Sequence, residues 1–394
     1  MRVGVNCFSL KPHIGGMKYY FLRLFQELLT HDQKTDYVFF YSQENLTELR
    51  KLEGTHWDQT AIRLEDESEI KNHLRGVDLY FCPLFILWPR PLPCPTLVTI
   101  PDIQEVFYPQ FFSAAERSIR AHHYPESMRL ADRVVTISSF SKKTFVDRHH
   151  IPPEKITVAY PSPDQRYLEA DRIAKNPGLP LDPKGFLLYP ANNWPHKNHE
   201  ALLRALVWLK KERNLEVPLV FTGTQLADGY PLQQRITEFG LSAQCSHFGY
   251  LTTEEIAYLY LRAGGLIFPS LFEGFGLPLV EAMAAGCPVL SSDAASLPEI
   301  GGDAVAYFAP GSPEAIGKAV AAFWQDEDQR KALAVKGRER ARRFSAARFA
   351  RSHLEAFAAA EKAFRKTRYR KQALRYSKSG RWIASLWSRF LREI

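Results

Sequence analysis

Two glutamates on either side of a glycine-bearing loop, Glu273 and Glu281, carry the clearest chemical signal in this sequence. The loop 274–276 reads Gly-Phe-Gly, and a helix is predicted to begin at Pro278 and to end at Gly286, where a left-handed cap is needed. The loop amides and the N-terminus of this helix would form an anion site. Carboxylates beside that site can accept charge-assisted hydrogen bonds from sugar hydroxyls. The pattern therefore favours a phosphate held between two hydroxyl-bearing rings over an ordinary strand–loop–helix with surface acids.

The hydrophobic pattern of the chain predicts the strands and helices that would position these residues. Short, continuous apolar runs alternate with helical patterns, as expected for parallel strands that are covered on both faces. The predicted strands are 2–7, 37–41, 79–82, 96–100, 133–137, 156–159, 186–189, 219–221, 266–268, 289–290 and 304–307. We therefore predict an α/β protein made of two doubly wound, Rossmann-like domains.

The predicted domain boundaries follow from composition. A Pro-rich, polar stretch lies between the two strand–helix series and marks the linker. The divisions are an N-terminal domain at 1–170, the linker at 171–185, a C-terminal domain at 186–345, a helix at 346–364 that packs back on the body, and a basic amphipathic tail at 365–394.

The segment around the two glutamates resembles the Glu–seven residues–Glu motif of retaining glycosyltransferases of family 4, which have the two-domain GT-B fold. The resemblance extends over about residues 1–360. The matching segments are 15–16, 100–104, 131–138 with Ser141, 189–198, 249–251 and 291–299. The resemblance implies that the two domains face a cleft, with the N-terminal domain on the acceptor side and the C-terminal domain binding a nucleotide sugar.

The resemblance also implies a role for each matching residue. Glu273 would hold hydroxyls of the donor sugar, Glu281 would hold the ribose hydroxyls, and Lys197 would neutralise the leaving diphosphate. The full set implied to bind the donor adds Gly15, Gly16, Asn192, His196, Leu251, Gly274, Phe275, Gly276 and Leu277. A charge such as that of Lys197 is also required on physical grounds, because a diphosphate that departs without a metal needs preorganised donors, each worth roughly 3–4 kcal/mol. The alternative is a solvated surface lysine.

The sequence departs from the family pattern in two places. The family has a histidine where this chain has Pro101, and Asp102 and Gln104 are the nearest substitutes for its contact with the donor sugar. We therefore count Asp102 as a third catalytic residue, with a turn residue at a strand end as the alternative. Many family members also have an arginine shortly before the lysine. This chain has Ala-Asn-Asn at 191–193, so His196 or a distant arginine would supply the second positive charge.

We predict no metal ion and no cofactor other than the donor itself. The Asp-Glu-Asp at 326–328 formally matches the motif of metal-dependent glycosyltransferases, but it lies in a polar stretch without other hard ligands. The histidine pairs 122–123 and 149–150 are adjacent residues, which do not share a helix face. Arg120 and His122 are instead candidates to line an acceptor pocket.

The formal net charge of +8, from 51 Lys and Arg against 43 Asp and Glu, is concentrated at the C-terminus. Residues 362–394 hold eleven bases and one acid, so the body is near neutral and gives no reason to expect a nucleic-acid partner. Trp382, Leu386 and Phe390 follow one another at i, i+4 spacing among arginines, which is typical of a helix at a membrane interface. We expect the tail to contact an anionic membrane, with docking on the body or a partner, or disorder, as the alternatives.

The function expected from these patterns is that of a cytoplasmic enzyme. Five cysteines without a C-x-x-C pair favour a reduced cytosol, and no run is long and apolar enough to span a membrane. We expect a retaining, metal-independent glycosyltransferase that moves a hexose from a UDP- or GDP-linked sugar to a hydroxyl of a glycan or lipid-linked glycan, in bacterial surface polysaccharide or lipopolysaccharide synthesis. The tail would hold it at the inner face of the cell membrane. A GT-B-fold sugar-nucleotide epimerase and a non-catalytic, membrane-associated sugar-nucleotide-binding protein are the alternatives.

Overall fold

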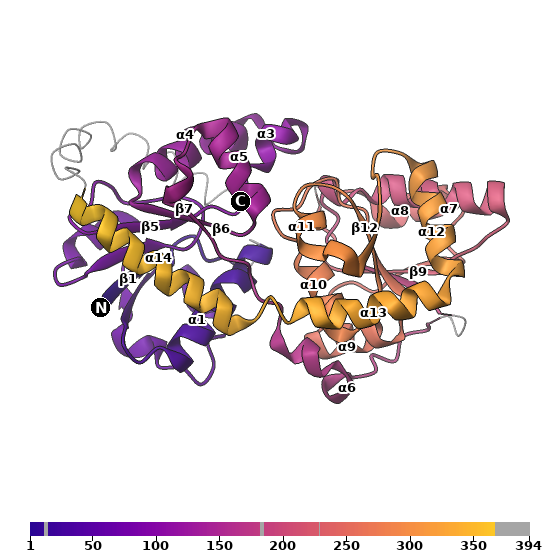
Figure 1. The fold of residues 1–394 in the computed structure, drawn as a ribbon, viewed down its shortest axis with the longest axis horizontal. Helices are drawn as coiled ribbons and strands as arrows, with labels where there is room; N and C mark the ends of the chain where they lie inside the picture. The colour runs from indigo at the N-terminus through magenta and orange to yellow at the C-terminus, as the bar shows by residue number, and fades with distance from the viewer. Residues whose placement is uncertain (12–14, 182–184, 228, 367–394) are drawn as a thin grey trace.

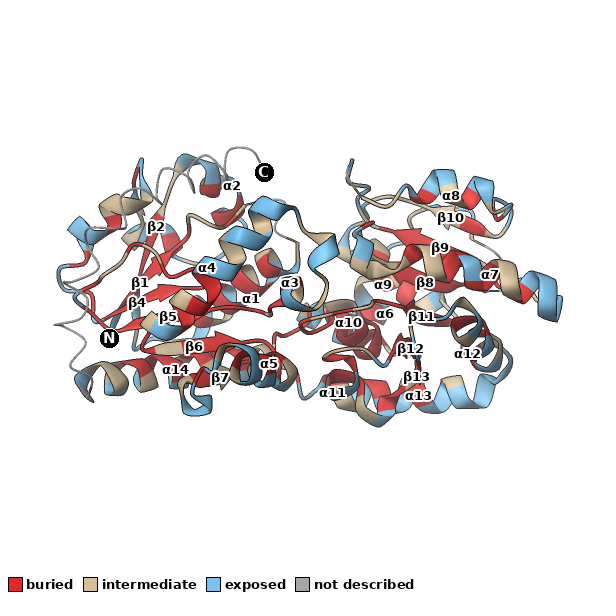
Figure 2. Ribbon diagram, turned by 90° about the horizontal axis from the view of Figure 1, so that it is seen from above, coloured by how far each residue is buried: buried red, intermediate tan, exposed pale blue. Residues whose placement is uncertain are grey.

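The structure of the chain, a computed structural model, describes residues 1–11, 15–181, 185–227 and 229–366. Two α/β domains lie side by side along the long axis of the molecule (Figure 1). The strands form the buried centre of each domain, and the helices turn their outer faces to solvent (Figure 2). This arrangement explains the continuous apolar runs, because a strand covered on both faces has no exposed side.

The first domain is built on a parallel sheet with the strand order β3-β2-β1-β4-β5-β6-β7. Its strands are β1 (Arg2–Asn6), β2 (Asp36–Tyr41), β3 (Ile62–Arg63), β4 (Leu79–Cys82), β5 (Thr96–Thr99), β6 (Arg133–Thr136) and β7 (Ile156–Val158). Its helices are α1 (Gly16–His31), α2 (Leu46–Leu49), α3 (Gln104–Phe107), α4 (Ala114–Leu130) and α5 (Ser139–His149).

The second domain is built on a parallel sheet with the strand order β10-β9-β8-β11-β12-β13. Its strands are β8 (Leu187–Pro190), β9 (Leu219–Thr222), β10 (Cys245–His247), β11 (Gly265–Phe268), β12 (Val289–Ser292) and β13 (Val305–Phe308). Its helices are α7 (His199–Arg213), α8 (Leu232–Glu238), α9 (Thr253–Arg262), α10 (Leu277–Ala285), α11 (Leu297–Gly301), α12 (Pro313–Gln325) and α13 (Glu327–Ala341).

Every predicted strand is present to within a few residues, and the prediction of two doubly wound α/β domains is confirmed. The sequence analysis missed β3 and β10, which lie at the outer edges of the two sheets. Both are only two or three residues long, and β10 contains a serine and a histidine. Short, polar edge strands lack the apolar run that identifies a central strand.

The strand order places the functional loops. In the second sheet the chain runs outward from β8 to β10 and then returns beside β8 with β11, so the order reverses between β8 and β11. Ligands of open α/β sheets bind at such a reversal, beyond the carboxyl ends of the strands. The loops that leave β8 and β11 carry Lys197 and Glu273, respectively.

The chain enters the second domain earlier than the predicted linker, 171–185. The one-turn helices η6 (Gln165–Glu169) and α6 (Ala170–Ile173) already pack against α10 and α9 of the second domain. Tyr167 and Ala170 are buried there, and the rings of Tyr167 and Tyr260 lie 5.6 Å apart. The crossing therefore falls at about residues 160–164. The linker was predicted too late in the chain because it was placed on the Pro-rich composition. Composition does not show that the short helices η6 and α6 pack against the second domain.

The last described helix, α14 (Ala346–Lys366), leaves the second domain and packs on the first (Figure 1). It covers α1, β5 and β6. His353 lies at its centre, and the Nε2 atom of this residue is 2.6 Å from the hydroxyl of Tyr20, which in turn is 2.9 Å from that of Thr99. The first domain is thus assembled from both ends of the described chain.

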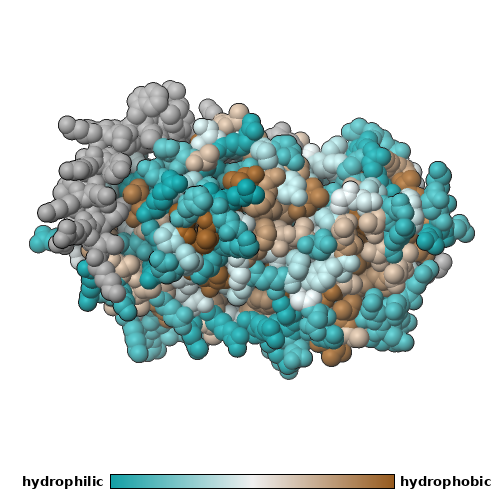
Figure 3. Space-filling model, turned by 45° about the horizontal axis from the view of Figure 1, so that its top comes forward, coloured by the Kyte–Doolittle hydropathy of each residue, from teal (hydrophilic) through white to brown (hydrophobic). Residues whose placement is uncertain are grey.

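The surface view shows a mostly hydrophilic face, with hydrophobic residues interspersed among the hydrophilic ones (Figure 3). Within the described ranges, no helix combines the length and apolar character needed to cross a membrane. The membrane contact predicted for the basic tail depends on residues 367–394, which lie outside the described residues.

Candidate functional site

The loop between the two glutamates has the predicted backbone. Helix α10 begins at Leu277, with Pro278 in its first turn, and ends at Gly286 in the left-handed conformation, at a φ of 78°. Gly276 caps the N-terminus at a φ of 95°, and a Cβ atom there would lie 2.7 Å from a methyl group of Leu297. Only glycine fits this turn, so the loop amides and the helix N-terminus are held at one place.

Glu273 and Lys197 form an ion pair inside the second domain. The Nζ atom of Lys197 is 2.7 Å from Oε1 of Glu273, and the two side chains are only 14% and 13% exposed. The carbonyl of Lys197 accepts a 2.6 Å hydrogen bond from the hydroxyl of Tyr189, which fixes the turn after β8. Burial by itself would raise the pKa of Glu273, but the charge and the hydrogen bond of Lys197 outweigh it and hold the pKa below its usual range. Glu273 is therefore ionised at neutral pH.

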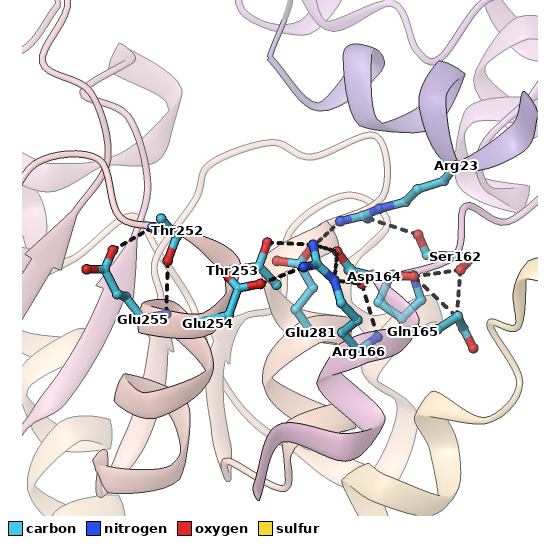
Figure 4. A network of polar contacts seen from close by, with 11 residues as sticks. Arg23, Ser162, Asp164, Gln165, Arg166, Thr252, Thr253, Glu254, Glu255 and Glu281 are labelled. Atoms are coloured by element: carbon cyan, nitrogen blue, oxygen red, sulfur yellow. Dashed lines mark hydrogen bonds and ion pairs between the residues drawn. The ribbon is translucent and has the colours of Figure 1, made fainter. Parts of the chain in front are cut away.

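Glu281 forms its ion pair across the two domains. Its Oε1 atom lies 2.9 Å from an Nη atom of Arg23, and the side chains are 15% and 17% exposed. The other Nη atom of Arg23 donates a 3.0 Å hydrogen bond to the carbonyl of Ser162 at the crossing between the domains (Figure 4). Burial raises the pKa of Glu281, and Arg23 opposes that rise only in part.

Arg23 was not predicted from the sequence. It lies on α1 between Leu22 and Leu24, and a single arginine among the apolar residues of a helix is a signal that could have marked it. The sequence analysis left His196 or a distant arginine as the source of a second positive charge, and the structure shows the surroundings of both candidates. Burial, reinforced by Lys197, lowers the pKa of His196 to about 4, so its ring is neutral at pH 7. Arg23 is an arginine, distant in sequence, that the fold brings to Glu281.

Asp102 reaches the site from the first domain. It follows β5, and its Oδ1 accepts a 3.1 Å hydrogen bond from the amide of Gln104. A Cβ atom added to Gly274 would lie 2.4 Å from Oδ2 of Asp102, so this carboxyl group packs directly on the glycine loop. Burial raises the pKa of Asp102, and the charge of Glu273 adds to the rise. The Nε2 atom of Gln104 is buried without a hydrogen-bond partner in the described structure.

An aromatic cluster beside Glu273 also joins the domains. The ring of Phe272 lies 5.4 Å from that of Phe107, 5.8 Å from that of Phe140 and 6.2 Å from that of Tyr108. The hydroxyl of Tyr108 donates a 3.2 Å hydrogen bond to the carbonyl of Leu271. The residue that precedes Glu273 is therefore anchored on the first domain. The sequence analysis missed this cluster, because no local pattern connects residues so far apart.

The other predicted donor residues surround the same loops. Gly15 caps α1 at a φ of 60°, and a Cβ atom on Gly16 would lie 3.8 Å from Leu277 at the start of α10. Asn192 accepts a 3.0 Å hydrogen bond from the amide of Thr224. Phe275 is buried against Tyr160 and Phe344. Leu251 is half-buried in the loop after β10.

One group in the described residues has the composition of a metal site. The possible ligand atoms of His122, His123 and Glu126 on α4 lie within 4.8 Å of one another. Arg90 forms an ion pair with Glu126, and its positive charge would repel a cation bound there. Arg120, predicted with His122 to line an acceptor pocket, lies 3.5 Å from buried Glu105. Arg120 and His122 thus have different partners, since His122 lies beside Glu126.

Comparisons with known proteins agree with this fold. Residues 171–340 match the family model of group 1 glycosyl transferases. The chain is 31% identical over 228 residues to O-antigen chain mannosyltransferase B of Escherichia coli, a match that covers 56% of this chain and 58% of the relative. It is 28% identical over 197 residues to the O-antigen chain mannosyltransferase RfbU of Salmonella typhimurium, covering 50% and 51% of the two chains. The chain thus spans about half the length of the curated relatives it matches.

Solved structures extend the likeness to nearly the whole described molecule. Anabaena Alr3699/HepE, solved in complex with UDP and glucose, superposes with a TM-score of 0.71 at 17% identity and covers 91% of this chain and 99% of its own. Such a likeness defines the fold, which is the two-domain GT-B fold of glycosyltransferases. The GT-B prediction is confirmed.

Proposed function

We propose that this protein is a glycosyltransferase that moves a hexose from a nucleoside diphosphate sugar to a hydroxyl group of a glycan or lipid-linked glycan. One observation carries the proposal. Two buried carboxylates, each paired with one cation, flank a glycine loop and a helix N-terminus at the point where the strand order reverses. The loop suits a diphosphate, and the carboxylates suit the hydroxyls of the sugar and of the ribose.

The proposed reaction uses these groups in separate roles. Lys197, the loop amides and the N-terminus of α10 stabilise the negative charge that develops on the leaving diphosphate. Glu273 holds hydroxyls of the sugar, and Asp102 reaches the same loop from the acceptor side. The acceptor oxygen forms a bond to the anomeric carbon on the face that the diphosphate leaves, and the carbon–phosphate oxygen bond breaks. The acceptor proton passes to a phosphate oxygen, so the configuration is retained without a covalent intermediate or a metal ion.

The relatives narrow the choice of substrate. Because two of them are named O-antigen chain mannosyltransferases, mannose is the first sugar to test, on GDP or UDP. A growing surface polysaccharide or a lipid-linked precursor is the acceptor to test. The buried thiols of all five cysteines are compatible with a reduced cytoplasm, where nucleotide sugars are made.

A single assay tests the proposal. The purified full-length chain is incubated with UDP-, GDP- and ADP-sugars, with and without lipid-linked glycan acceptors, and nucleotide release is followed. We expect release that depends on the acceptor, persists in a chelator and gives a product with the anomeric configuration of the donor. A new sugar nucleotide formed without acceptor would instead indicate an epimerase, and binding without release would indicate a non-catalytic protein.

The site assignment is tested in the same assay with Glu273→Gln, which keeps the shape of the side chain and removes its charge. Near-normal turnover by this variant would contradict the assignment. Lys336→Ala is a matched control, because it breaks an exposed lysine–carboxylate pair, with Asp303, far along the chain from the loop. We expect this variant to retain normal turnover.

A further inference from the structure

Arg23 connects three segments that are distant in sequence. It projects from α1 of the first domain, its two Nη atoms reach Glu281 on α10 and the carbonyl of Ser162, and Figure 4 shows it above the crossing between the domains. A guanidinium group can serve two acceptors at once because its donors are held in a planar fork. A lysine at this position would offer a single ammonium group instead.

The contact leaves half of the Glu281 carboxylate available. Arg23 binds Oε1, and among the described residues no hydrogen bond is found to Oε2. The side chain is 15% exposed, so Oε2 can accept a hydrogen bond from a ligand. Arg23 thus fixes one oxygen of the carboxylate and directs the other.

The charges around Glu281 make Arg23 its main electrostatic support. Asp164 at the crossing is a like charge that raises the pKa of Glu281, as does burial, whereas Arg23 lowers it. In the described part of the chain, the phenols of Tyr19, Tyr167 and Tyr260 also face this carboxylate. Without Arg23, no cation among these neighbours would oppose the rise in the pKa of Glu281.

We propose that Arg23 is a positioning residue for recognition of the nucleotide ribose: it orients Glu281 and favours its ionised form, and it does so only when the first domain is docked on the second. The inference rests on the proposed function, in which Glu281 holds the ribose hydroxyls. It adds that the ribose subsite, although built on the second domain, is completed by the first. Nucleotide affinity and domain closure are then thermodynamically linked.

The test compares ribonucleotides with analogues that lack the hydroxyls. UDP and GDP, and their 2′,3′-dideoxy forms, are titrated calorimetrically into the wild-type chain and into Arg23→Ala and Arg23→Lys. We expect Arg23→Ala to weaken binding of the ribonucleotide about 10-fold and to leave that of the dideoxy form nearly unchanged. Arg23→Lys keeps the positive charge without the planar fork of donors, so its affinity for the ribonucleotide should lie between those of the wild type and Arg23→Ala.

The pH dependence separates positioning from general damage. The loss caused by Arg23→Ala should be greater at about pH 6 than at about pH 8, because Glu281 without its cation takes up a proton more readily. Arg166→Ala is the matched control. Arg166 lies in the same network and pairs with Asp164 and Glu254, and among the described residues no hydrogen bond or ion pair joins it to Glu281 (Figure 4). This control should keep the ribose preference and pH profile of the wild type.

The outcomes distinguish this inference from the function on which it rests. If the wild type prefers the ribonucleotide and Arg23→Ala keeps the same preference and pH profile, the inference is wrong and the proposed function stands. If the wild type does not distinguish the two forms, or binds neither nucleotide, the assignment of Glu281 to the ribose fails, and the inference fails with it. Thermal unfolding of each variant shows whether it is folded, and Arg23→Lys provides the same readout if the alanine variant is not.

Discussion

Glu273 precedes the glycine loop and Glu281 lies one turn into the helix that follows it, and their environments differ. Each is almost buried and bonded to one cation at less than 3 Å. The pKa of Glu273 is nevertheless lowered, whereas that of Glu281 is raised. Burial acts on both in the same direction. The difference comes from the charge of Lys197 beside Glu273, and from the carboxylate of Asp164 near Glu281.

The origin of the two cations explains what this difference means for function. Lys197 comes from the loop after β8, next to the strand that carries Glu273, so that pair is complete within one domain. Arg23 comes from the other domain, so the pair with Glu281 exists only when the domains are docked. We infer that the sugar and diphosphate end of the site is preformed, while the ribose end depends on closure.

The largest effect should follow from removing the preformed cation. Lys197→Ala is expected to lower turnover about 10²- to 10³-fold, because one preorganised donor to the leaving diphosphate is lost. It also leaves Glu273 buried without a counter-charge. Steady-state turnover with saturating donor measures the effect, and Lys197→Arg should recover part of it. Equal damage from Lys197→Ala and from the surface variant Lys336→Ala would show that the pair has no special role.

The second prediction concerns the pair between the domains. Glu281→Gln keeps the shape but removes the charge, and it should raise the Kd for the nucleotide about 10-fold, because a charge-assisted hydrogen bond to the ribose becomes a neutral one. Turnover at saturating donor should change much less than in Lys197→Ala. A collapse of turnover with an unchanged Kd would remove the distinction between the two carboxylates.

Acidification should affect the ribose end of the site, at Glu281, before the sugar end, at Glu273. Because its pKa is raised, Glu281 takes up a proton at a higher pH than an ordinary glutamate, and Glu273, with its lowered pKa, at a lower pH. As the pH falls, nucleotide affinity should therefore weaken, by up to about 10-fold, before the pair of Lys197 and Glu273 is lost. Calorimetric titrations across the acid range measure this order. Glu281→Gln should show no such early weakening.

The smallest effect is expected where the first domain contacts the loop itself. Phe272→Ala removes the ring that packs on Phe107 and Phe140. The ring–ring contacts alone are worth roughly 0.5–1.5 kcal/mol, so the docked arrangement should be disfavoured by at least about 2- to 10-fold. Small-angle scattering should show a more open average shape. Phe272→Leu, which keeps apolar bulk, should lie between this variant and the wild type. If turnover by Phe272→Ala fell as far as that of Lys197→Ala, the sugar end could not be called preformed.

Much of the fold was predictable because local pattern encodes it. Apolar runs identified the inner strands, and the Pro and Gly residues around α10 identified its ends. The pairing of Lys197 with Glu273 follows the strand order, which places the loops after β8 and β11 together. Edge strands β3 and β10 were not predicted, because they are too short and too polar to produce an apolar run.

The contacts between the domains were beyond local pattern. Arg23 and Phe272 are ordinary members of a helix and a loop until the other domain is placed against them. The neutral state of His196 has the same origin, since a sequence shows that a histidine is present but not that burial will discharge it. The site is therefore best predicted where one domain builds it and worst where two domains share it.

The return of α14 to the first domain also bears on synthesis of the chain. Phe349 and Phe357 on this helix pack against Tyr20 and Phe81, with ring centroids 5.1 Å and 5.4 Å apart. Phe349 and Phe357 are synthesised only after the whole second domain has been made. The domain that begins first must therefore wait with part of its core uncovered, while the second has all of its strands and can fold ahead of it.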